Sequence, residues 1–361
     1  MKTLLKLDWD VLNTYIEEDL IKVNKHPEYD IWILNYTTTA SVTRHWDDYT
    51  MACRGMVIDA EGNILARPFG KFKNYEEHDP SEIDMSMDYE VFEKMDGSFI
   101  VVFYYHERSG WIVASRGSFI SEQAIVAEEL LGDKWLYFAK NCTYCLEVIY
   151  PENRIVVNYG NKRELVLLGC IITPTGVELP HSRLITMYST YFTIVKKYEL
   201  DKVNDLLELK AIESENKEGF VIRFENGFRV KIKFTEYCRL HAILTNVSNK
   251  TVWEHMMNKL EFTELLDRVP DEFFDWLTKT AKELQDEYNE IERLALLEFV
   301  KIYYKNGNHK RGNFAEQAKE SENRAILFKL YDNRPYDDII WKRIKPEYSK
   351  PFKDGYEEIT K

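Results

Sequence analysis

Cysteine is scarce in this sequence of 361 residues, which holds only five, spread along the chain. An odd number of widely separated cysteines argues against the disulfide framework that stabilises small secreted domains. Cys142 and Cys145 have CxxC spacing, but no second pair of cysteine or histidine residues lies nearby at the spacing of a zinc finger. We therefore expect ordinary buried thiols at both positions.

Long apolar runs are also missing. The N-terminal segment reaches Asp8 and Asp10 before any apolar run forms that could act as a signal peptide, and no later stretch has the length of a membrane span. The sequence shows no internal repeat and no low-complexity segment. These absences predict a folded cytoplasmic protein without a membrane partner.

Positively charged residues are also relatively few. The sequence has 48 Lys and Arg residues against 61 Asp and Glu residues, which gives a net charge of −13. Such a charge repels nucleic acid on average. A local cluster of Lys and Arg can still hold phosphates, so the net charge does not exclude a nucleic-acid substrate. With 45% hydrophobic residues, a chain of this length can form two ordinary cores, which predicts two domains.

Residues 30–233 carry short β-branched and aromatic runs separated by turn residues. Glycine turns predict hairpins at Glu61-Gly62, Ser109-Gly110 and Asn226-Gly227. Helical spacing of apolar residues predicts helices over 10–25, 121–140 and 182–198. Many hairpins without a regular βαβ alternation predict an α+β domain with antiparallel sheets over residues 1–244.

The strand signals stop after residue 244, and an all-helical C-terminal domain is predicted over 245–361. A long helix begins at Asp271, behind Pro270, and ends near Asn306-Gly307. Shorter helices are expected over 251–268, 314–331 and 337–345.

One strand of the first domain ends in Lys94-Met95-Asp96-Gly97, which by itself is only a β-turn pattern. Further polar elements share the strand-rich region with it: Cys53-Arg54-Gly55, Arg67 to Asn74, Ser115-Arg116-Gly117-Ser118, Leu146-Glu147-Val148, Glu218-Gly219-Phe220-Val221 and Lys231-Ile232-Lys233. Glu147 and Glu218 have apolar neighbours, where a carboxylate is costly without a cation or hydrogen-bond donors. Lys231 and Lys233 are expected to point to one face of a strand while Ile232 packs on the other.

In the order of these elements the chain resembles the covalent nucleotidyltransferase superfamily of RNA ligases, DNA ligases and capping enzymes. It resembles most closely the phage RNA ligase 1 family, the T-even type that repairs nicked tRNA, over residues 36–241. The matching segments read CRGMVID, RPFGKFKN, KMDGS, SRGSFISEQA, PENRIVVNY and KEGFVIRF to KIK.

This resemblance implies an ATP-grasp-like nucleotidyltransferase domain and a reaction in three steps. Lys94 attacks the α-phosphate of ATP, AMP passes to an RNA 5′-phosphate, and a 3′-hydroxyl displaces the AMP. The residues implied to bind ATP or AMP are Arg54, Lys71, Phe72, Gly97, Arg116, Glu147, Lys231 and Lys233. Asp96, Glu147 and Glu218 are implied to hold Mg²⁺, or Mn²⁺ in its place, in part through water. Gly97 is expected to let the backbone approach the nucleotide.

The implied partners are ATP and RNA with a 5′-phosphate and a 3′-hydroxyl, either single-stranded RNA or a broken tRNA. We expect a monomer in the cytoplasm, which is the host cytoplasm if the protein is phage-encoded. The C-terminal domain is expected either to select the RNA or only to steady the catalytic domain. Phe72 fits core packing as well as an adenine contact, and Arg154 fits a structural ion pair as well as an RNA contact.

Three other functions stay open at this point. A DNA ligase or a capping enzyme usually carries a β-barrel after the Lys-x-Lys element, whereas helices are predicted here, which favours an RNA ligase. An RNA-end-binding protein with an inactive transferase fold is the alternative outside enzymes. Such a protein would not need its Lys94, its three site carboxylates and its Lys-x-Lys pair together.

Overall fold

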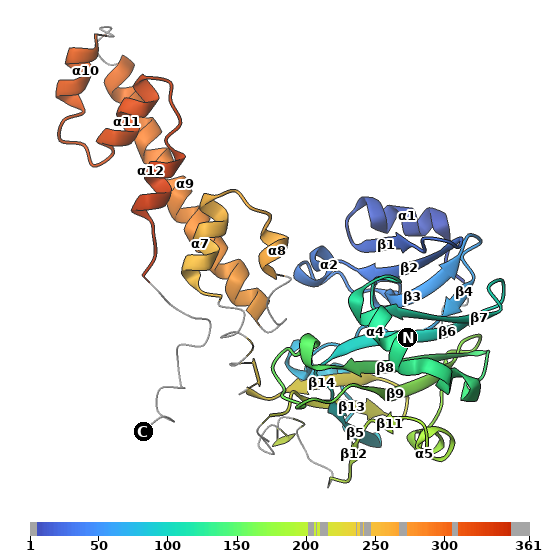
Figure 1. Cartoon of the computed structure of the whole chain (residues 1–361). Helices are drawn as coiled ribbons and strands as arrows, with labels where there is room; N and C mark the ends of the chain where they lie inside the picture. Colours follow the sequence, from blue (N-terminus) through green and yellow to red (C-terminus); the bar gives the residue numbers. More distant parts are fainter. Residues whose placement is uncertain are drawn as a thin grey trace. The chain divides into compact units, whose positions relative to one another are not determined.

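The computed structural model describes residues 6–200, 206, 208–209, 216–235, 237–238, 241, 247–266, 273–304 and 310–347. Its contacts divide the chain into two compact units, Met1–His241 and Ala242–Lys361, which Figure 1 shows as a strand-rich and a helical part. The boundary predicted at 244/245 lies next to this division.

The described part of unit 1 is built on three sheets, most of whose strands Figure 1 labels. The first has the order β1-β2-β3-β4 and the second the order β10-β9-β8-β6-β7, with β11 pairing in parallel with β9; the third has the order β12-β5-β13-β14. The strands of the first sheet are β1 (Ile21–Lys25), β2 (Ile31–Tyr36), β3 (Arg54–Asp59) and β4 (Ile64–Ala66). Those of the second are β6 (Ser98–Tyr105), β7 (Gly110–Ser115), β8 (Cys142–Ile149), β9 (Glu164–Ile172), β10 (Val177–Glu178) and β11 (Thr193–Ile194). The third holds β5 (Tyr89–Lys94), β12 (Lys197–Tyr198), β13 (Gly219–Phe224) and β14 (Arg229–Lys233).

The three predicted hairpins are confirmed, because β3 pairs with β4, β6 with β7 and β13 with β14 in antiparallel register. Fold class is confirmed as well, since the sheets are antiparallel apart from the short β11 pairing. Side chains of the first two sheets share one core, which includes Ile33 and Val57 on one side and Val101 and Phe103 on the other. The first two sheets therefore pack face to face.

The described part of unit 1 also contains α-helices, several of which pack on the first two sheets. They are α1 (Trp9–Glu17), α2 (Thr38–Val42), α3 (Asp48–Ala52), α4 (Glu122–Leu131) and α5 (His181–Tyr188). Short 3₁₀ turns lie at Tyr75–Glu77, Pro80–Glu82, Gly132–Tyr137 and Pro151–Asn153. Leu12 of α1 packs with Leu34 and Met56 of the first sheet. Val126 of α4 and Leu184 of α5 pack on the second sheet.

Two of the predicted helices are too long. The segment 10–25 is helical only as far as Glu17, and Ile21–Lys25 forms strand β1. The segment 182–198 ends its helix at Tyr188 and continues into the short strands β11 and β12. In the first case the second half pairs with β2, and in the second it pairs with β9 and β5; these strand pairings override the local helical pattern.

The chain changes sheets between β5 and β6. Lys94 is the last residue of β5 in the third sheet, and Ser98 is the first residue of β6 in the second. Only Met95, Asp96 and Gly97 separate the two strands. Because the end of β5 pairs with β13 and the start of β6 pairs with β8, this short crossing connects the neighbourhoods of β13 and β8.

The described part of unit 2 contains helices and no strand. The helices are α7 (Asn249–Met257), α8 (Phe262–Leu266), α9 (Phe274–Tyr304), α10 (Arg311–Gln317), α11 (Arg324–Tyr331) and α12 (Asp337–Arg343). The long helix predicted from Asp271 is found as α9, while Asp271 and Asn306-Gly307 lie outside the described residues. The single helices predicted over 251–268 and 314–331 are wrong, because non-helical residues separate α7 from α8 and α10 from α11.

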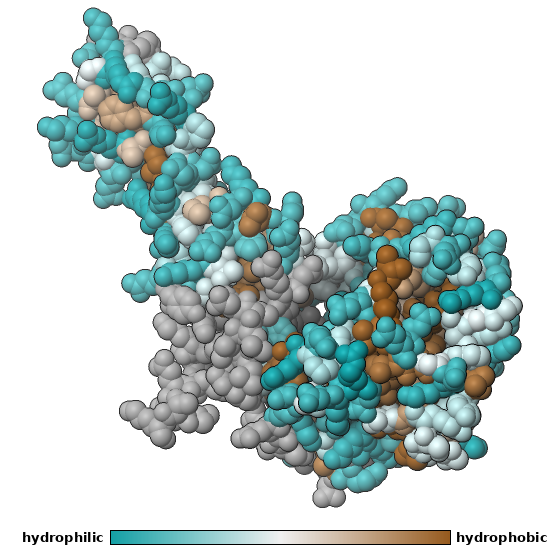
Figure 2. All heavy atoms as spheres, viewed as in Figure 1, coloured by the Kyte–Doolittle hydropathy of each residue, from teal (hydrophilic) through white to brown (hydrophobic). Residues whose placement is uncertain are grey.

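The surface of unit 2 that Figure 2 presents is largely hydrophilic. None of the described helices combines the length and the apolar composition that a membrane span requires.

Candidate active site

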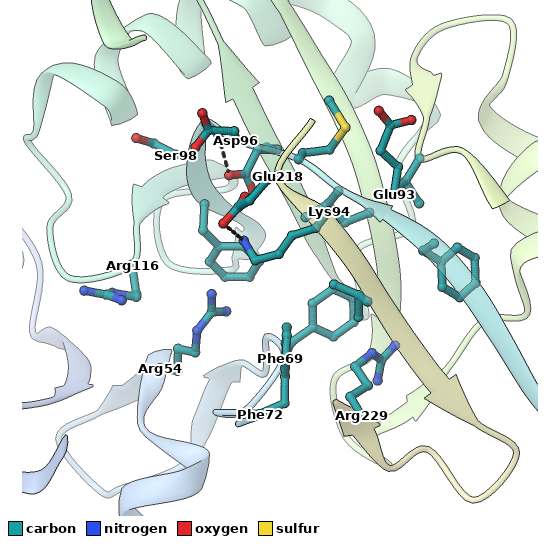
Figure 3. A pocket seen from close by; sticks show the side chains of 18 of the residues that line it. Arg54, Phe69, Phe72, Glu93, Lys94, Asp96, Ser98, Arg116, Glu218 and Arg229 are labelled. Atoms are coloured by element: carbon teal, nitrogen blue, oxygen red, sulfur yellow. Dashed lines mark hydrogen bonds and ion pairs between the residues drawn. The ribbon is translucent and has the colours of Figure 1, made fainter. Parts of the chain in front are cut away.

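Lys94 projects into a pocket of about 560 Å³ in unit 1 (Figure 3). The pocket wall includes most of the residues that the sequence singled out: Arg54, Phe72, Lys94, Asp96, Gly97, Arg116, Glu147 and Glu218. These residues come from β3, the loop after β4, the β5–β6 crossing, the end of β7, β8 and the start of β13. The fold thus brings together elements that lie up to 164 positions apart, from Arg54 to Glu218.

Glu218 is the direct partner of Lys94. Its Oε1 lies 2.6 Å from Lys94 Nζ, and the dashed line in Figure 3 marks this contact. The pairing follows from strand register, because Lys94 is opposite Gly219 and Glu218 immediately precedes that glycine. Burial raises the pKa of Glu218, while the charges of Lys94 and Lys233 act in the opposite direction.

Glu147 is a second buried carboxylate beside the lysine. It lies in the second half of β8, and its Oε1 accepts a hydrogen bond from the Gly97 backbone N–H at 3.2 Å. Burial raises the pKa of Glu147 to about 7, and the neighbouring Glu218 charge adds to this, whereas Lys94 and Arg54 lower it. Two buried carboxylates therefore share one lysine, which leaves the pocket floor with excess negative charge when both are ionised.

Asp96 is held differently from the other two carboxylates. Its Oδ2 accepts hydrogen bonds from the backbone N–H groups of Val156 and Val157, at 2.9 and 2.7 Å, and its Oδ1 accepts one from the Tyr237 hydroxyl at 2.7 Å. We refer to this set of contacts as the Asp96 clamp. The clamp fixes the β5–β6 crossing, and its three hydrogen bonds leave Asp96 about one of its four lone-pair positions for the metal-ligand role expected of it.

The structure requires glycine at position 97 because of packing within the protein, whereas the glycine was expected to let the nucleotide approach the backbone. A Cβ at this position would lie 2.5 Å from the Val148 carbonyl oxygen and 2.6 Å from Ile149 Cδ1. The absence of a side chain therefore lets the crossing pack against β8, whether or not a nucleotide also approaches the backbone here.

Arg54 and Arg116 form the cationic wall of the pocket (Figure 3). The Arg54 guanidinium lies over the ring of Phe99, 4.4 Å from its centroid, and 5.6 Å from that of Phe72. Arg116 lies 5.6 Å from the Tyr36 ring centroid. Phe72 thus lines the pocket and also packs against Arg54, so both roles considered for it agree with its position.

Three of the expected ATP-binding lysines do not line this pocket. Lys71 is buried between the rings of Tyr36 and Trp46, at 5.1 and 4.9 Å, and borders a neighbouring cavity. Lys231 and Lys233 lie on one face of β14 while Ile232 is buried on the other, as predicted. The charge of Lys233 still reaches the site, because it lowers the pKa of Glu218 against the effect of burial.

Sequence reasoning missed several residues of the pocket. Tyr237 enters through the Asp96 clamp, and Glu178, Arg223 and Arg229, which also line the pocket, form an ion-pair network. Arg229 also lies 4.4 Å from the ring centroid of Phe69. Arg223 and Arg229 lie between Lys217 and Lys233, in the last of the matching segments, whereas no local pattern points to Glu178.

The donor set suits a divalent cation at Glu147 and Glu218. Both carboxylates are buried, at 8% and 4% exposure, and burial raises the pKa of each, so a cation would relieve an unfavourable pair of charges. No group of three or more His, Cys, Asp or Glu side chains in the described ranges is arranged to hold a metal. Two carboxylates with water completing the shell match the usual coordination of Mg²⁺.

Comparison with known proteins covers most of the residues that form this pocket. The model of a protein family described as RNA ligase, the phage RNA ligase 1 type, matches residues 52–237, which contain all of the expected site residues. The chain belongs to this RNA ligase family. The match extends from the residue before Cys53 to Tyr237 of the Asp96 clamp.

Two relatives are similar to this chain over part of their length. A candidate RNA ligase of Thermovibrio ammonificans is 28% identical over 245 residues, covering 63% of this chain and 61% of the relative. An uncharacterised protein, ORF64, of Ostreid herpesvirus 1 is 24% identical over 284 residues, covering 63% of this chain and 69% of the relative. The chain thus spans about three fifths of the length of the T. ammonificans relative.

Solved structures overlap with the chain only loosely. A candidate ATP-dependent DNA ligase from Aquifex aeolicus covers 91% of this chain and all of its own length, with 14% identity and a TM-score of 0.49. An archaeal ATP-dependent RNA ligase covers 90% and 86%, with 14% identity and a TM-score of 0.47. A Naegleria gruberi RNA ligase with AMP and Mn covers 46% and 56%, with 17% identity and a TM-score of 0.38. Family membership therefore rests on the sequence match.

Proposed function

We propose that the chain is an ATP-dependent RNA ligase that carries AMP on Lys94. The observation that carries this proposal is the position of Lys94 Nζ, which lies in a pocket wide enough for a nucleotide and 2.6 Å from the buried Glu218 carboxylate. Membership of the RNA ligase family supports the same assignment.

The first step needs Lys94 as a neutral amine, because an ammonium has no electron pair to give. Glu218 Oε1 is the atom placed to take the proton, and the raised pKa of Glu218 favours that transfer. The Nζ electron pair then forms a bond to the α-phosphorus of ATP. The bond from that phosphorus to the bridging oxygen breaks, and diphosphate leaves with the electron pair.

Arg54 and Arg116 are proposed to contact the phosphate groups from the cationic wall. Glu147 and Glu218 are proposed to hold Mg²⁺ or Mn²⁺, with Lys71, Lys231 and Lys233 acting from outside the pocket described above. A bound divalent cation would stabilise the negative charge on the transferring phosphoryl oxygens. The Asp96 clamp holds the β5–β6 crossing so that Lys94 keeps its place.

In the later steps the AMP passes to the 5′-phosphate of an RNA, and the 3′-hydroxyl of a second RNA end displaces it. The proposed substrates are single-stranded RNA ends or a broken tRNA, and the helical unit 2 is proposed to select among them. An inactive RNA-end-binding protein is the competing function, but no described feature of the site favours it.

The test is to incubate the purified protein with α-labelled ATP and Mg²⁺, without RNA, and to separate it on a denaturing gel. We expect an acid-labile labelled band that is absent in Lys94→Ala and is not formed from GTP. If protein first stripped with diphosphate takes up no label while its fold is intact, Lys94 is not the nucleophile and the binding-protein function replaces the proposal.

A further inference from the structure

Asn35 is a pocket residue that lies outside every motif segment described above. It belongs to β2, where Ile33 and Leu34 face two different cores, and the register with β3 shifts between Leu34 and Asn35. This irregularity pairs Asn35 with Arg54 across the two strands and turns Asn35 toward the pocket. Bulges of this kind re-aim a side chain beside a functional site.

Asn35 and Arg54 each carry a buried polar atom that lacks a hydrogen-bond partner among the described residues. These atoms are the acceptor Asn35 Oδ1 and the donor Arg54 Nη1. The Arg54 guanidinium is flanked by the rings of Phe99 and Phe72, which offer it no oxygen acceptor. A buried donor and a buried acceptor left unsatisfied are each costly, so two of them on neighbouring strands at one pocket wall point to a ligand.

The chemistry of this ligand follows from the two atoms. A phosphate oxygen accepts from Arg54 but has no proton to give to Asn35 Oδ1. A hydroxyl group can do both, because it donates one hydrogen bond and accepts another. We propose that Asn35, together with Arg54, binds a ribose hydroxyl and so makes the enzyme prefer ribose over deoxyribose. This inference rests on the proposed function.

The hydroxyl can come from the ribose of ATP or from the terminal ribose of the RNA. Both sources present the same group to Asn35, and the 2′-hydroxyl is the feature that separates RNA from DNA. The experiment therefore has a nucleotide arm and an RNA arm, each with matched substrates that differ by one hydroxyl.

In the nucleotide arm, wild type and Asn35→Ala are compared with ATP, 2′-deoxy-ATP and 3′-deoxy-ATP, by labelling rate and by the rise in melting temperature on nucleotide binding. If ATP supplies the hydroxyl, wild type prefers ATP over one deoxy form, and Asn35→Ala loses about tenfold with ATP and little with that deoxy form. Asn35→Asp keeps an acceptor and should keep the preference.

In the RNA arm, a pre-adenylylated RNA is sealed to acceptor strands whose last sugar is ribose or 2′-deoxyribose. If RNA supplies the hydroxyl, the preference for ribose falls in Asn35→Ala here and not in the nucleotide arm. Asn24→Ala is the matched control, because Asn24 Nδ2 donates to the Gly117 carbonyl from the neighbouring strand and does not line the pocket. It should keep both preferences.

The inference is overturned if Asn35→Ala slows all substrates equally or leaves the hydroxyl preference of both arms unchanged. A wild type that shows no preference in either arm overturns it as well. Failure of the proposed function looks different, because the wild type would then take up no label from any nucleotide. The melting-temperature comparison still tests Asn35 in that case, since it reports binding without catalysis.

Discussion

Glu147 is ionised at a cost in free energy, because burial raises its pKa from an ordinary value of 4.5 to about 7. Between these two values the folded protein binds more protons at this carboxyl than the unfolded chain does. Stability therefore falls as the pH rises from about 4.5 to about 7, and the full penalty is present above pH 7.

Glu147→Gln removes this ionisation and can still accept the hydrogen bond from Gly97. We expect the variant to be more stable than wild type at pH 8, by about 2–3 kcal/mol, and no more stable near pH 4.5. Denaturant unfolding at several pH values measures the difference. An equal effect at every pH would show that the gain has another origin. Labelling of Lys94 should fall in the same variant.

Asp96 offers the opposite case, a site carboxylate that stabilises the fold. Asp96→Asn can satisfy fewer of the three donors in the Asp96 clamp, and we expect a loss of about 2–4 kcal/mol in the free energy of unfolding. Tyr237→Phe removes one contact of the clamp and should lose less. If both variants unfold like wild type while labelling is lost, Asp96 acts in the chemistry and not through the clamp.

At the scale of elements, the turn from Glu218 into β13 depends on Gly219. Its φ of +152° is one that residues with a side chain rarely adopt, and a Cβ would lie 2.0 Å from the Ile232 carbonyl oxygen on β14. We expect Gly219→Ala to destabilise the protein by about 2 kcal/mol or more and to displace Glu218 from Lys94.

Gly227 provides the matched control for this variant. It sits at the other end of the β13–β14 hairpin with a φ of +83°, and no atom lies within 4 Å of the position of its Cβ. Gly227→Asn should be tolerated, since asparagine adopts positive φ at low cost. Melting temperature and Lys94 labelling distinguish the two variants. Equal losses in both would mean that the hairpin tolerates no change at either glycine.

Strands and helices can be predicted from the sequence where the local residue pattern agrees with the strand pairing of the folded protein. Each hairpin joins neighbouring segments through a glycine turn, so the sequence carried all the information needed. The helix predicted over 10–25 shows where this fails. Asp19 has a φ of +53° after α1, and Ile21–Lys25 then pairs with β2, a contact that the helical spacing of its apolar residues does not reveal.

The site likewise contains residues that the local sequence reveals and residues whose place depends on contacts elsewhere in the fold. Lys94, Glu147 and Glu218 were found because they occur in motifs whose order is informative. Asn35 and Tyr237 have no such local pattern, since one gains its place from a strand irregularity and the other from a hydrogen bond to a residue 141 positions away. The different roles of Asp96 and Glu218 likewise depend on which donors surround each carboxylate.

At the scale of the whole molecule, each unit has hydrophobic clusters of its own among the residues that the structure describes. Those of unit 1 contain residues from Leu7 to Cys238, and the cluster of unit 2 surrounds Phe314 and Leu327. A chain cut after residue 244 should therefore fold and still label Lys94, while its rate of RNA sealing falls. Circular dichroism and the two activity assays test this. A truncated chain that fails to fold would show that unit 1 needs unit 2.

The Asp96 clamp also has a consequence for the time course of synthesis. It joins residue 96 to positions 156 and 157 and to position 237, contacts of long sequence separation that form late in folding. A growing chain on the ribosome has Lys94 long before it has Tyr237. If Lys94 must be held by the clamp to react, the nascent protein cannot consume ATP until nearly all of unit 1 has emerged.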